Sequence, residues 1–296
     1  MLHEPVLLHE VLSGLDLHEG QIVLDGTLGD GGHSRAIGEA IGPTGTLIGL
    51  DADPAAIERA GKNLADLPCR KIFHCGNFRD IEAHLETLGF PTIDRALLDL
   101  GLSSPQLADP TRGFSFQSDG PLLMTLSGEA AEEASAASLV NRLTVGELGD
   151  ILAQYGEEGY ARRIAEAIVA ARRQGPILTT GALVRVIEEA VPKGYRFGRK
   201  HFATKTFQAL RIATNDELGA LVQGLTGIWA HLAPQGRLAV ISFHSLEARI
   251  VKEHFRNWSK TGEGTLLHKH AVKPTREEEI RNPRSRSATL RIISKN

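Results

Sequence analysis

The chain of 296 residues contains few cysteines and no long apolar run. Cys69 and Cys75 are its only cysteines, so no four-cysteine zinc site can form, and the twelve histidines lack ligand spacing. We therefore predict two buried, reduced thiols and no bound metal. No apolar run approaches the roughly 18 residues that span a membrane, and the N-terminus lacks the pattern of a signal peptide. These absences predict a cytoplasmic protein that does not enter a membrane.

The chain also lacks an overall positive charge, since its formal net charge is −3, but its charges are segregated. Residues 193–211 contain six Lys or Arg and no acidic residue. Residues 249–296 contain twelve Lys or Arg against five Glu. Basic segments of this kind can attract a polyanion such as a nucleic acid, although a solvated surface can have the same composition.

Short apolar segments alternate with helix-like segments over the first hundred residues. The pattern predicts strands over residues 21–25, 46–51, 70–74 and 96–100, and helices over residues 34–41 and 54–64. Each strand is followed by polar or glycine-rich sequence. Alternation of this kind predicts an α/β fold with a parallel, doubly wound sheet whose ligands bind at the carboxyl ends of the strands.

The strand pattern stops in the middle of the chain and then resumes. Residues 107–213 are therefore expected to form a helical insertion in a discontinuous α/β domain of residues 1–106 and 214–296. Predicted helices there and just beyond cover residues 147–174 with a break at Gly156, 180–191 with Thr180 as cap, and 216–232 with Asn215 as cap. Further strands are predicted over residues 236–242, 266–272 and 288–294.

A glycine-rich loop, DGTLGDGGHS at residues 25–34, follows the first predicted strand. It does not match the dinucleotide pattern G-x-G-x-x-G, because residue 34 is Ser, and no Gly-Lys-Ser/Thr follows as in a P-loop. A pyrophosphate would also be repelled by Asp25 at the end of the strand. A ligand with a positive group, such as S-adenosylmethionine, suits that carboxylate.

Two later positions also favour S-adenosylmethionine. Asp51 ends the second predicted strand in GLDADP, where a carboxylate can accept both hydroxyl protons of a ribose. Phe78 follows the third strand and could form an apolar wall for the adenine ring.

The chain also carries a long succession of motifs in a fixed order. They are HEPVLLHEVL, DGTLGDGGHSRAI, GLDADPAAI, GNF, LLDLGLSSPQL, RGFSF, YGEEGYARRIA, TFQALRI, NDEL, RLAVISFHSLEARIVK and NPRSRSATLRI. This succession resembles the bacterial 16S rRNA (cytosine-N4)-methyltransferases of the RsmH or MraW type. The resemblance covers nearly the whole chain.

The resemblance implies a class I methyltransferase fold with an all-helical insertion for substrate recognition. It also implies that a methyl group passes from S-adenosylmethionine to the exocyclic N4 of a cytidine in the decoding region of 16S rRNA. The RNA would be presented within the small ribosomal subunit or one of its assembly intermediates.

The resemblance further assigns roles to individual residues. The cofactor contacts map onto Gly31, Gly32, His33, Asp51, Phe78, Asp99 and Gln106. Asp99 is also the candidate catalytic residue, because it follows the fourth strand and could accept a proton of the substrate amine. The expected substrate contacts are Ser103, Ser104, Arg199, Lys200, Arg284 and Arg286. His244, which lies near the expected cleft, is expected to be structural.

Aromatic residues are interleaved with the basic residues of segment 193–211. They are Tyr195, Phe197, Phe202 and Phe207. This composition suits contacts to phosphates and stacked bases, but the same rings could belong to the core of the insertion. For Phe207 we expect the core.

Three positions depart from the family pattern. PLDMRM is here PLLMTL, with Leu123 and Thr125 at the charged positions, and SFHSLEDR has Ala248 in place of Asp. Cofactor binding is expected to survive these changes.

Two functions remain as alternatives to rRNA methylation. They are an S-adenosylmethionine-binding ribosome-assembly or RNA-binding factor with weakened catalysis, and a DNA amino-methyltransferase. The latter would favour a Pro-Pro-aromatic motif after the fourth strand, which this chain lacks.

Overall fold

The structure is a computed structural model that describes residues 5–128, 134–198 and 200–296. The chain forms two compact units. The first combines Met1–Gly101 with Leu218–Asn296, and the second is Leu102–Glu217. These divisions fall within a few residues of those expected after residues 106 and 213.

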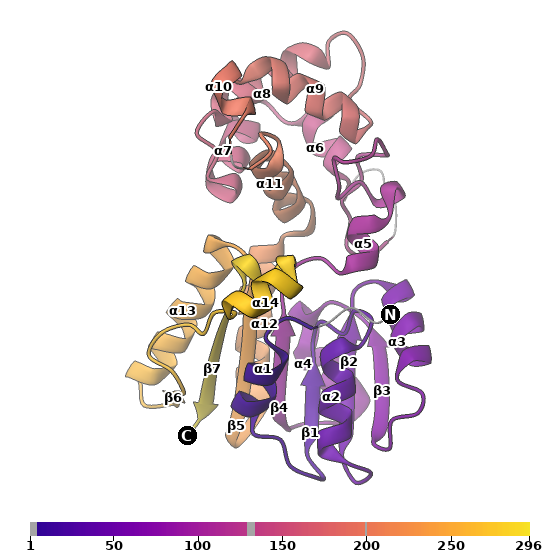
Figure 1. Cartoon of the computed structure of the whole chain (residues 1–296), viewed down its shortest axis with the longest axis vertical. Helices are drawn as coiled ribbons and strands as arrows, with labels where there is room; N and C mark the ends of the chain where they lie inside the picture. Colours follow the sequence, from indigo (N-terminus) through magenta and orange to yellow (C-terminus); the bar gives the residue numbers. More distant parts are fainter. Residues whose placement is uncertain (1–4, 129–133, 199) are drawn as a thin grey trace. The chain divides into compact units, whose positions relative to one another are not determined.

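The first unit is built on a seven-stranded sheet with the order β3-β2-β1-β4-β5-β7-β6 (Figure 1). The strands are β1 (Ile22–Asp25), β2 (Thr46–Asp51), β3 (Arg70–Cys75), β4 (Ile93–Asp99), β5 (Leu232–Ser242), β6 (Gly264–Leu266) and β7 (Thr289–Lys295). The first five are parallel, and β7 runs antiparallel to both β5 and β6. This is a mostly parallel, doubly wound, Rossmann-like sheet, so the predicted α/β fold class is confirmed.

Helices cover both faces of this sheet, because successive strand side chains point to opposite sides. On β4, Leu97 packs into one apolar cluster and Leu98 into the other. One face is covered by α1 (Leu8–Leu15), α2 (Gly32–Ile41) and α3 (Pro54–Asn63). The other is covered by α4 (Ile81–Leu88), α12 (Glu217–His231) and α13 (Ser245–Lys260). Both sides of the central strands are therefore buried, which explains their continuous apolar sequences.

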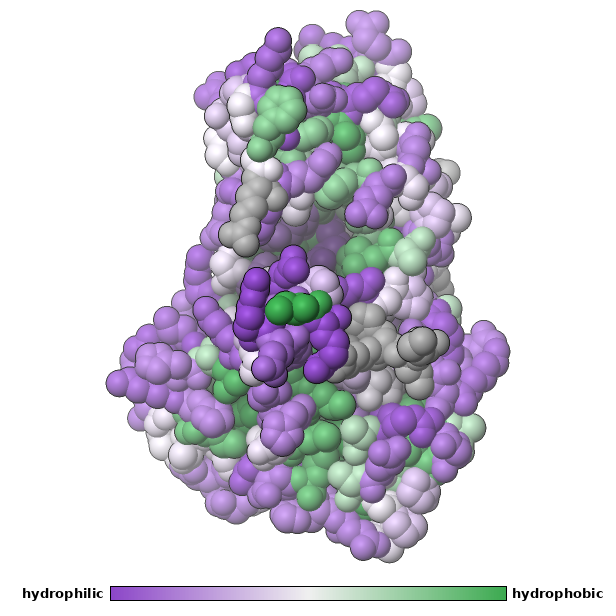
Figure 2. Space-filling view, viewed as in Figure 1, coloured by the Kyte–Doolittle hydropathy of each residue, from purple (hydrophilic) through white to green (hydrophobic). Residues whose placement is uncertain are grey.

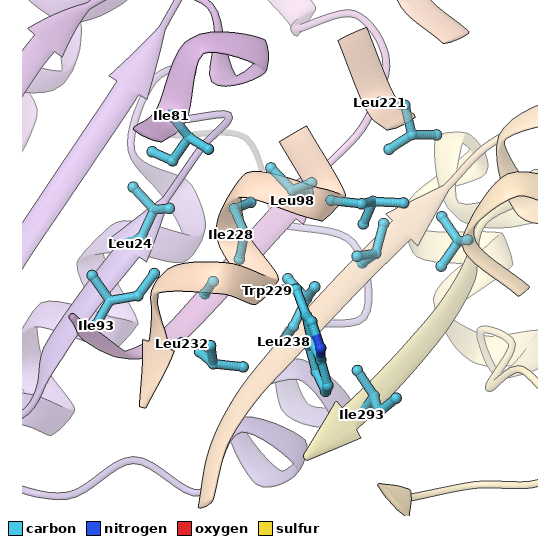
Figure 3. Close-up of a cluster of buried hydrophobic side chains, with 14 of the residues drawn as sticks. Leu24, Ile81, Ile93, Leu98, Leu221, Ile228, Trp229, Leu232, Leu238 and Ile293 are labelled. Carbon is cyan, nitrogen blue, oxygen red and sulfur yellow. The ribbon is translucent and has the colours of Figure 1, made fainter. Parts of the chain in front are cut away.

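Figure 3 shows the apolar cluster on the face of the sheet that is covered by α4, α12 and α13. Leu24 and Leu98 of the sheet gather there with Ile81 of α4 and Trp229 of α12, and all four are at most 6% exposed. Burial of side chains of this size stabilises the fold by about 1.5–3 kcal/mol each. The cluster holds α12 on the sheet and so fixes the element that leads into β5.

The second unit consists of helices around its own apolar core. They are α5 (Ser104–Ala108), α6 (Ala136–Arg142), α7 (Val145–Gly156), α8 (Ala161–Ala171), α9 (Thr180–Ala190), α10 (Lys193–Arg196) and α11 (Thr204–Asn215), with a 3₁₀ turn η2 (Pro110–Arg112). Leu152, Ile164 and Leu210 are fully buried in that core. Among the described residues of this unit, the only β pairing is an isolated bridge between Pro121 and Thr179.

Several predictions about single elements are wrong. The strand expected over residues 266–272 is confined to Gly264–Leu266, and Val272 forms only an isolated bridge with Leu290. Asn215 does not cap α12. It ends α11, and its side chain accepts a hydrogen bond from the Leu126 N–H and donates one to the Met124 carbonyl.

Two smaller corrections concern a helix cap and a thiol. The residue that caps α9 is Thr179, whose hydroxyl accepts from the N–H of Ala182, and Thr180 is the first helical residue.

Both cysteines are free, but Cys69 is buried whereas Cys75 is exposed, so the expectation of two buried thiols holds only for Cys69. Cys75 is exposed because it ends β3 at the outer edge of the sheet.

Hydrophilic residues cover most of the surface on the face seen in Figure 2. Within the part of the chain that the structure describes, no helix is both long and apolar enough to cross a membrane.

The different exposure of the two thiols gives a first prediction. Cys75 should react at once with a thiol reagent in the native protein, whereas Cys69 should react only after unfolding, since burial raises the pKa of its thiol and blocks access. Thiol titration before and after addition of denaturant measures this. Cys75→Ser should remove the fast phase, and two fast thiols in the native protein would contradict the structure.

Candidate functional site

Three carboxylates end three neighbouring strands of the first unit. Asp25 ends β1, Asp51 ends β2 and Asp99 ends β4, and these strands are adjacent in the sheet order β2-β1-β4. The carboxyl edge of a parallel sheet is where α/β proteins bind their ligands. We refer to Asp25, Asp51 and Asp99 as the carboxylate edge.

Asp25 holds the glycine-rich loop together. Its side chain, 2% exposed, accepts hydrogen bonds from the Thr27 N–H at 3.1 Å and from the Ser34 hydroxyl at 2.7 Å. Thr27 in turn accepts a hydrogen bond from the Asp99 N–H at 2.7 Å, which ties the loop to the end of β4. Ser34, which breaks the dinucleotide pattern, is therefore a hydrogen-bond donor to the buried carboxylate. Burial raises the pKa of Asp25 to about 6.

The loop leads into α2 through Gly31, whose φ of 85° lies in the left-handed region. A Cβ at this position would lie 2.7 Å from Cδ1 of Leu64, so space also requires glycine here. Because Gly31 is the N-cap, no side chain caps the first turn of α2, which begins with Gly32 and His33. N–H groups at such a helix start can bind an anionic group.

The Asp51 carboxylate is oriented by two backbone N–H groups. Its Oδ2 accepts from Gly29 at 2.8 Å and its Oδ1 accepts from Asp53 at 2.9 Å. Burial raises the pKa of Asp51, and these two hydrogen bonds oppose that rise. Each carboxylate oxygen can accept more than one hydrogen bond, so the pair can still accept two hydroxyl groups from a ligand.

His33 faces Asp99 in a defined protonation state. Its Nε2 donates to the Val6 carbonyl at 2.9 Å, since a carbonyl oxygen can only accept. Burial lowers the pKa of His33 to about 4, so the ring is neutral near pH 7 and Nδ1 carries a lone pair. That Nδ1 lies 3.5 Å from Oδ2 of Asp99. His33 therefore presents an acceptor, rather than a positive charge, to the carboxylate.

Asp99 itself is protonated near neutral pH in this arrangement. Burial raises its pKa to about 8, with further contributions from the negative charges of Asp25 and Glu247. Its Oδ1 is buried and has no hydrogen-bond partner among the residues described. An unsatisfied buried carboxyl oxygen is costly, and a positively charged or hydrogen-bonding ligand would relieve that cost.

Phe78 begins the 3₁₀ turn η1 (Phe78–Asp80) that follows β3. The residue is half-buried, and its ring packs closely on α12, where a Cβ at Gly224 would lie 2.4 Å from the Phe78 Cδ2. The glycine on α12 thus makes room for the aromatic ring.

Residues 1–296 match the MraW methylase family. A ribosomal RNA small subunit methyltransferase H from Syntrophotalea carbinolica is 45% identical over 306 residues, which cover 98% of this chain and 97% of that protein. The protein of the same name from Thermomicrobium roseum is 47% identical, with 99% and 93% of the two chains covered. The chain belongs to the MraW methylase family.

A solved structure described as an rRNA methylase, from Streptococcus thermophilus, aligns with a TM-score of 0.46 and 11% identity. The alignment covers 100% of this chain and 98% of that one.

The carboxylate edge in this member of the MraW methylase family also depends on residues that sequence reasoning missed. Val6, Thr27 and Glu247 were not predicted, since their roles come from backbone contacts or from charge at a distance. His244 was expected to be structural, and it is the N-cap of α13: its ring accepts from the N–H of Glu247 at 3.4 Å. The spacing of His244 and Glu247 is that of a capping box, which could have been recognised if His had been considered as a cap.

Four of the predicted site residues that the structure describes belong to the second unit, and a fifth predicted residue lies outside the described residues. Ser103 caps α5, and its N–H donates to Oε1 of Gln106 at 3.0 Å, so these two residues form a capping box. Ser104 is the first residue of that helix and is half-buried. Lys200 is exposed, and Arg199 lies outside the described residues.

The two predicted arginines near the end of the chain belong to the first unit. Arg284 and Arg286 lie on the 3₁₀ turn η4 (Pro283–Ser287) and are exposed, whereas Ser285 between them is buried. This turn leads directly into β7, whose first residue, Thr289, is opposite Ser242 at the carboxyl end of β5. η4 therefore lies at the same edge of the sheet as the three carboxylates.

The altered segment with Leu123 and Thr125 is held through its backbone. Arg112 donates from Nη2 to the carbonyls of Thr125 at 3.0 Å and Leu126 at 2.9 Å, and Asn215 bonds the flanking backbone. None of these contacts uses the side chain of residue 123 or 125, so the segment keeps its place without the charges of the family pattern.

The carboxyl of Asp99, whose side chain is 26% exposed but whose Oδ1 is buried, gives a prediction about pH. The unfolded chain ionises this group near pH 4 but the folded chain only near pH 8, so its burial costs stability that increases as the pH rises between these values. We expect Asp99→Asn to raise the free energy of unfolding by about 1–3 kcal/mol at pH 8.5, with the gain shrinking toward pH 5.

Denaturant unfolding at several pH values measures this difference. Asp150→Asn, which changes an exposed carboxylate of α7, serves as the control and should leave the pH profile unchanged. Parallel profiles for Asp99→Asn and the natural chain would show that Asp99 is ionised in the folded protein.

Proposed function

We propose that this protein transfers a methyl group from S-adenosylmethionine to the exocyclic N4 of a cytidine in the decoding region of 16S rRNA. The observation that carries the proposal is the match of the whole chain to the MraW methylase family, together with full-length relatives named ribosomal RNA small subunit methyltransferase H. The RNA is presented in the small ribosomal subunit, or in an assembly intermediate, in the cytoplasm.

The chemistry of the carboxylate edge suits S-adenosylmethionine. This molecule has an ammonium group, a sulfonium group and a ribose diol but no phosphate. Asp25 and Asp51 supply negative charge along one edge, and Asp99 adds hydrogen-bonding oxygens there, of which Oδ1 is buried without a partner among the described residues. A phosphate-bearing cofactor would instead meet repulsion here.

Each group of the cofactor has a suitable residue. Asp51 accepts the ribose hydroxyls, since its carboxylate is already oriented by Gly29 and Asp53. The first turn of α2, at Gly32 and His33, binds the methionine carboxylate. Asp99 accepts from the ammonium group, and Phe78 contacts the adenine. Gln106 is the remaining contact implied by the family resemblance. When bound, S-adenosylmethionine supplies a methyl group that is activated by the neighbouring positive sulfur.

Asp99 also prepares the attacking amine. The lone pair of the cytosine N4 is delocalised into the ring, so the nitrogen must become pyramidal before it can attack. A carboxylate that accepts a hydrogen bond from the N4 amine favours this geometry. Both oxygens of Asp99 can accept hydrogen bonds only when the carboxyl group is ionised. A nearby positive charge on the cofactor favours the ionised form of Asp99. The carbon–nitrogen bond forms as the carbon–sulfur bond breaks, and the surplus amine proton passes to water.

The RNA contacts come from residues of both units. Arg284 and Arg286 carry positive charge at the edge of the sheet where Asp99 lies, which suits phosphates near the reacting base. Lys200 and Arg199 supply charge from the second unit, and Ser103 and Ser104 contact the base. The target cytidine must leave its stack to reach the carboxylate edge.

A transfer assay tests the proposed function. S-adenosylmethionine with a labelled methyl group is incubated with unmethylated small subunits, free rRNA and duplex DNA. We expect label at a cytosine N4 of small-subunit rRNA, and loss of at least about 100-fold in rate for Asp51→Ala, because the ribose contact is lost. Asp150→Ala is the matched control.

The other outcomes of this assay separate the alternatives. Cofactor binding without transfer to any substrate would mean an assembly or RNA-binding factor, and label in DNA alone would overturn the proposal.

The raised pKa of Asp99 predicts that cofactor binding depends on pH. The ammonium group of the cofactor binds ionised Asp99 better than protonated Asp99, so the affinity of the natural chain for S-adenosylmethionine should rise between pH 6 and 8.5 relative to the affinity of Asp99→Asn. The asparagine variant corrects for titration of the ligand. Isothermal titration calorimetry gives both affinities, and a ratio of the two affinities that does not vary with pH would contradict the role of Asp99.

A further inference from the structure

The basic segment of the second unit, residues 193–211, contains four aromatic rings in very different environments. Phe207 is 4% exposed and lies in the helical core. Tyr195 donates from its hydroxyl to Oε2 of Glu158 at 2.8 Å and packs edge-on against the Tyr160 ring. Phe202 is half-buried. These three rings therefore have structural partners.

Phe197 is the exception, since 87% of it is exposed. It is the C-cap residue directly after α10 and is followed by Gly198, whose N–H bonds back to the carbonyl of Tyr195. A single exposed apolar residue is not unusual in itself. What distinguishes Phe197 is that it has the highest exposure among the large hydrophobic side chains of the described chain. It also lies in a segment that has no acidic residue of its own, although the preceding Arg196 pairs with Glu188 outside the segment.

The segment that carries Phe197 is anchored on both sides. On the N-terminal side, Tyr195 is held by Glu158. On the C-terminal side, the His201 ring is stacked on both Phe116, at 4.4 Å between centroids, and Phe202, at 4.2 Å. Anchored flanking residues limit the conformational freedom that the segment loses when a ligand binds, which favours binding.

Positive charge accompanies the exposed ring. Lys193 and Lys200 are both exposed and lie four and three residues from Phe197 along the chain, and segment 193–211 has no acidic residue. A protein partner that merely buried an apolar side chain would gain nothing from this excess of cations. An unpaired nucleotide offers both a flat base for the ring and phosphates for the lysines.

We propose that Phe197 is a base-stacking residue, on which an unpaired nucleotide of the RNA substrate stacks while Lys193 and Lys200 bind the adjoining phosphates. This inference rests on the proposed function, because it requires that the substrate be RNA. It adds a binding site that is remote in sequence from the carboxylate edge. The stacked nucleotide is distinct from the target cytidine and positions the RNA on the helical unit.

Binding measurements on the full-length protein with small-subunit rRNA test this role. Phe197→Ala should weaken RNA binding about tenfold, and Phe197→Leu should weaken it nearly as much, because leucine keeps an apolar surface but has no flat ring. Phe197→Trp should bind at least as tightly as the natural chain. Leu178→Ala, at another exposed apolar residue of the same unit, is the matched control and should have no effect.

Salt dependence separates stacking from charge. Phe197→Ala should leave the slope of log affinity against log salt concentration unchanged. Lys193→Ala and Lys200→Ala should each reduce that slope by about one. In addition, the fluorescence of Phe197→Trp should be quenched when RNA binds, as expected for a base on the indole ring.

The results distinguish this inference from the proposed function. If the natural chain methylates rRNA but Phe197→Ala binds it within about twofold of the natural affinity, the stacking role is wrong and the proposed function stands. If Phe197→Leu binds rRNA with the affinity of the natural chain, the stacking role is also wrong, because that result indicates an apolar contact such as one with a protein partner. If the natural chain neither binds nor methylates rRNA, the proposed function and the stacking role both fall.

Discussion

The buried carboxylate of Asp25 is the interaction on which the site depends. It accepts hydrogen bonds from two points of the glycine-rich loop, Thr27 and Ser34, and Thr27 accepts one from the backbone of Asp99. The loop, the start of α2 and the end of β4 are thereby held in one arrangement. Without this carboxylate the hydroxyl of Ser34, which is fully buried, would lose its acceptor.

The same carboxylate makes the neighbouring acid harder to ionise. Asp25 and Glu247 both oppose a negative charge on Asp99, and the neutral ring of His33 does nothing to offset them. A group held in an unfavourable environment gains more from a complementary ligand than a solvated group does. The protein thus maintains an electrostatic cost in its free form that a cationic ligand would remove.

Much of the fold could be predicted from the sequence, because it depends on regular apolar patterns. The predicted strand over residues 46–51 agrees with β2 at both ends, and the helix predicted from Pro54 begins there. Asp51 and Asp99 could be placed at strand ends for the same reason. The prediction failed where a residue's role depends on a distant partner: Asn215 looked like a helix cap but bonds to residues 124 and 126, about ninety positions away.

The site shows the same limit. Nothing in the local sequence indicates that His33 donates to Val6, although this hydrogen bond decides which ring nitrogen faces Asp99. Ser34 was read as a glycine missing from a pattern, whereas it is a donor to Asp25. Exposure could be predicted only in part: Phe207 was expected in the core and is buried there, but nothing in the sequence distinguished Phe197 as the exposed ring.

The order of the strands along the chain has a consequence for how the protein is made. β4 pairs with β1 on one side and β5 on the other, but β5 begins at Leu232, after the whole helical unit. During synthesis, the apolar strand β4 must therefore remain an open edge while more than a hundred further residues are added. Open edges of this kind invite mispairing. The helical unit has its own core, so it can fold during that interval, before β5 and α12 complete the sheet.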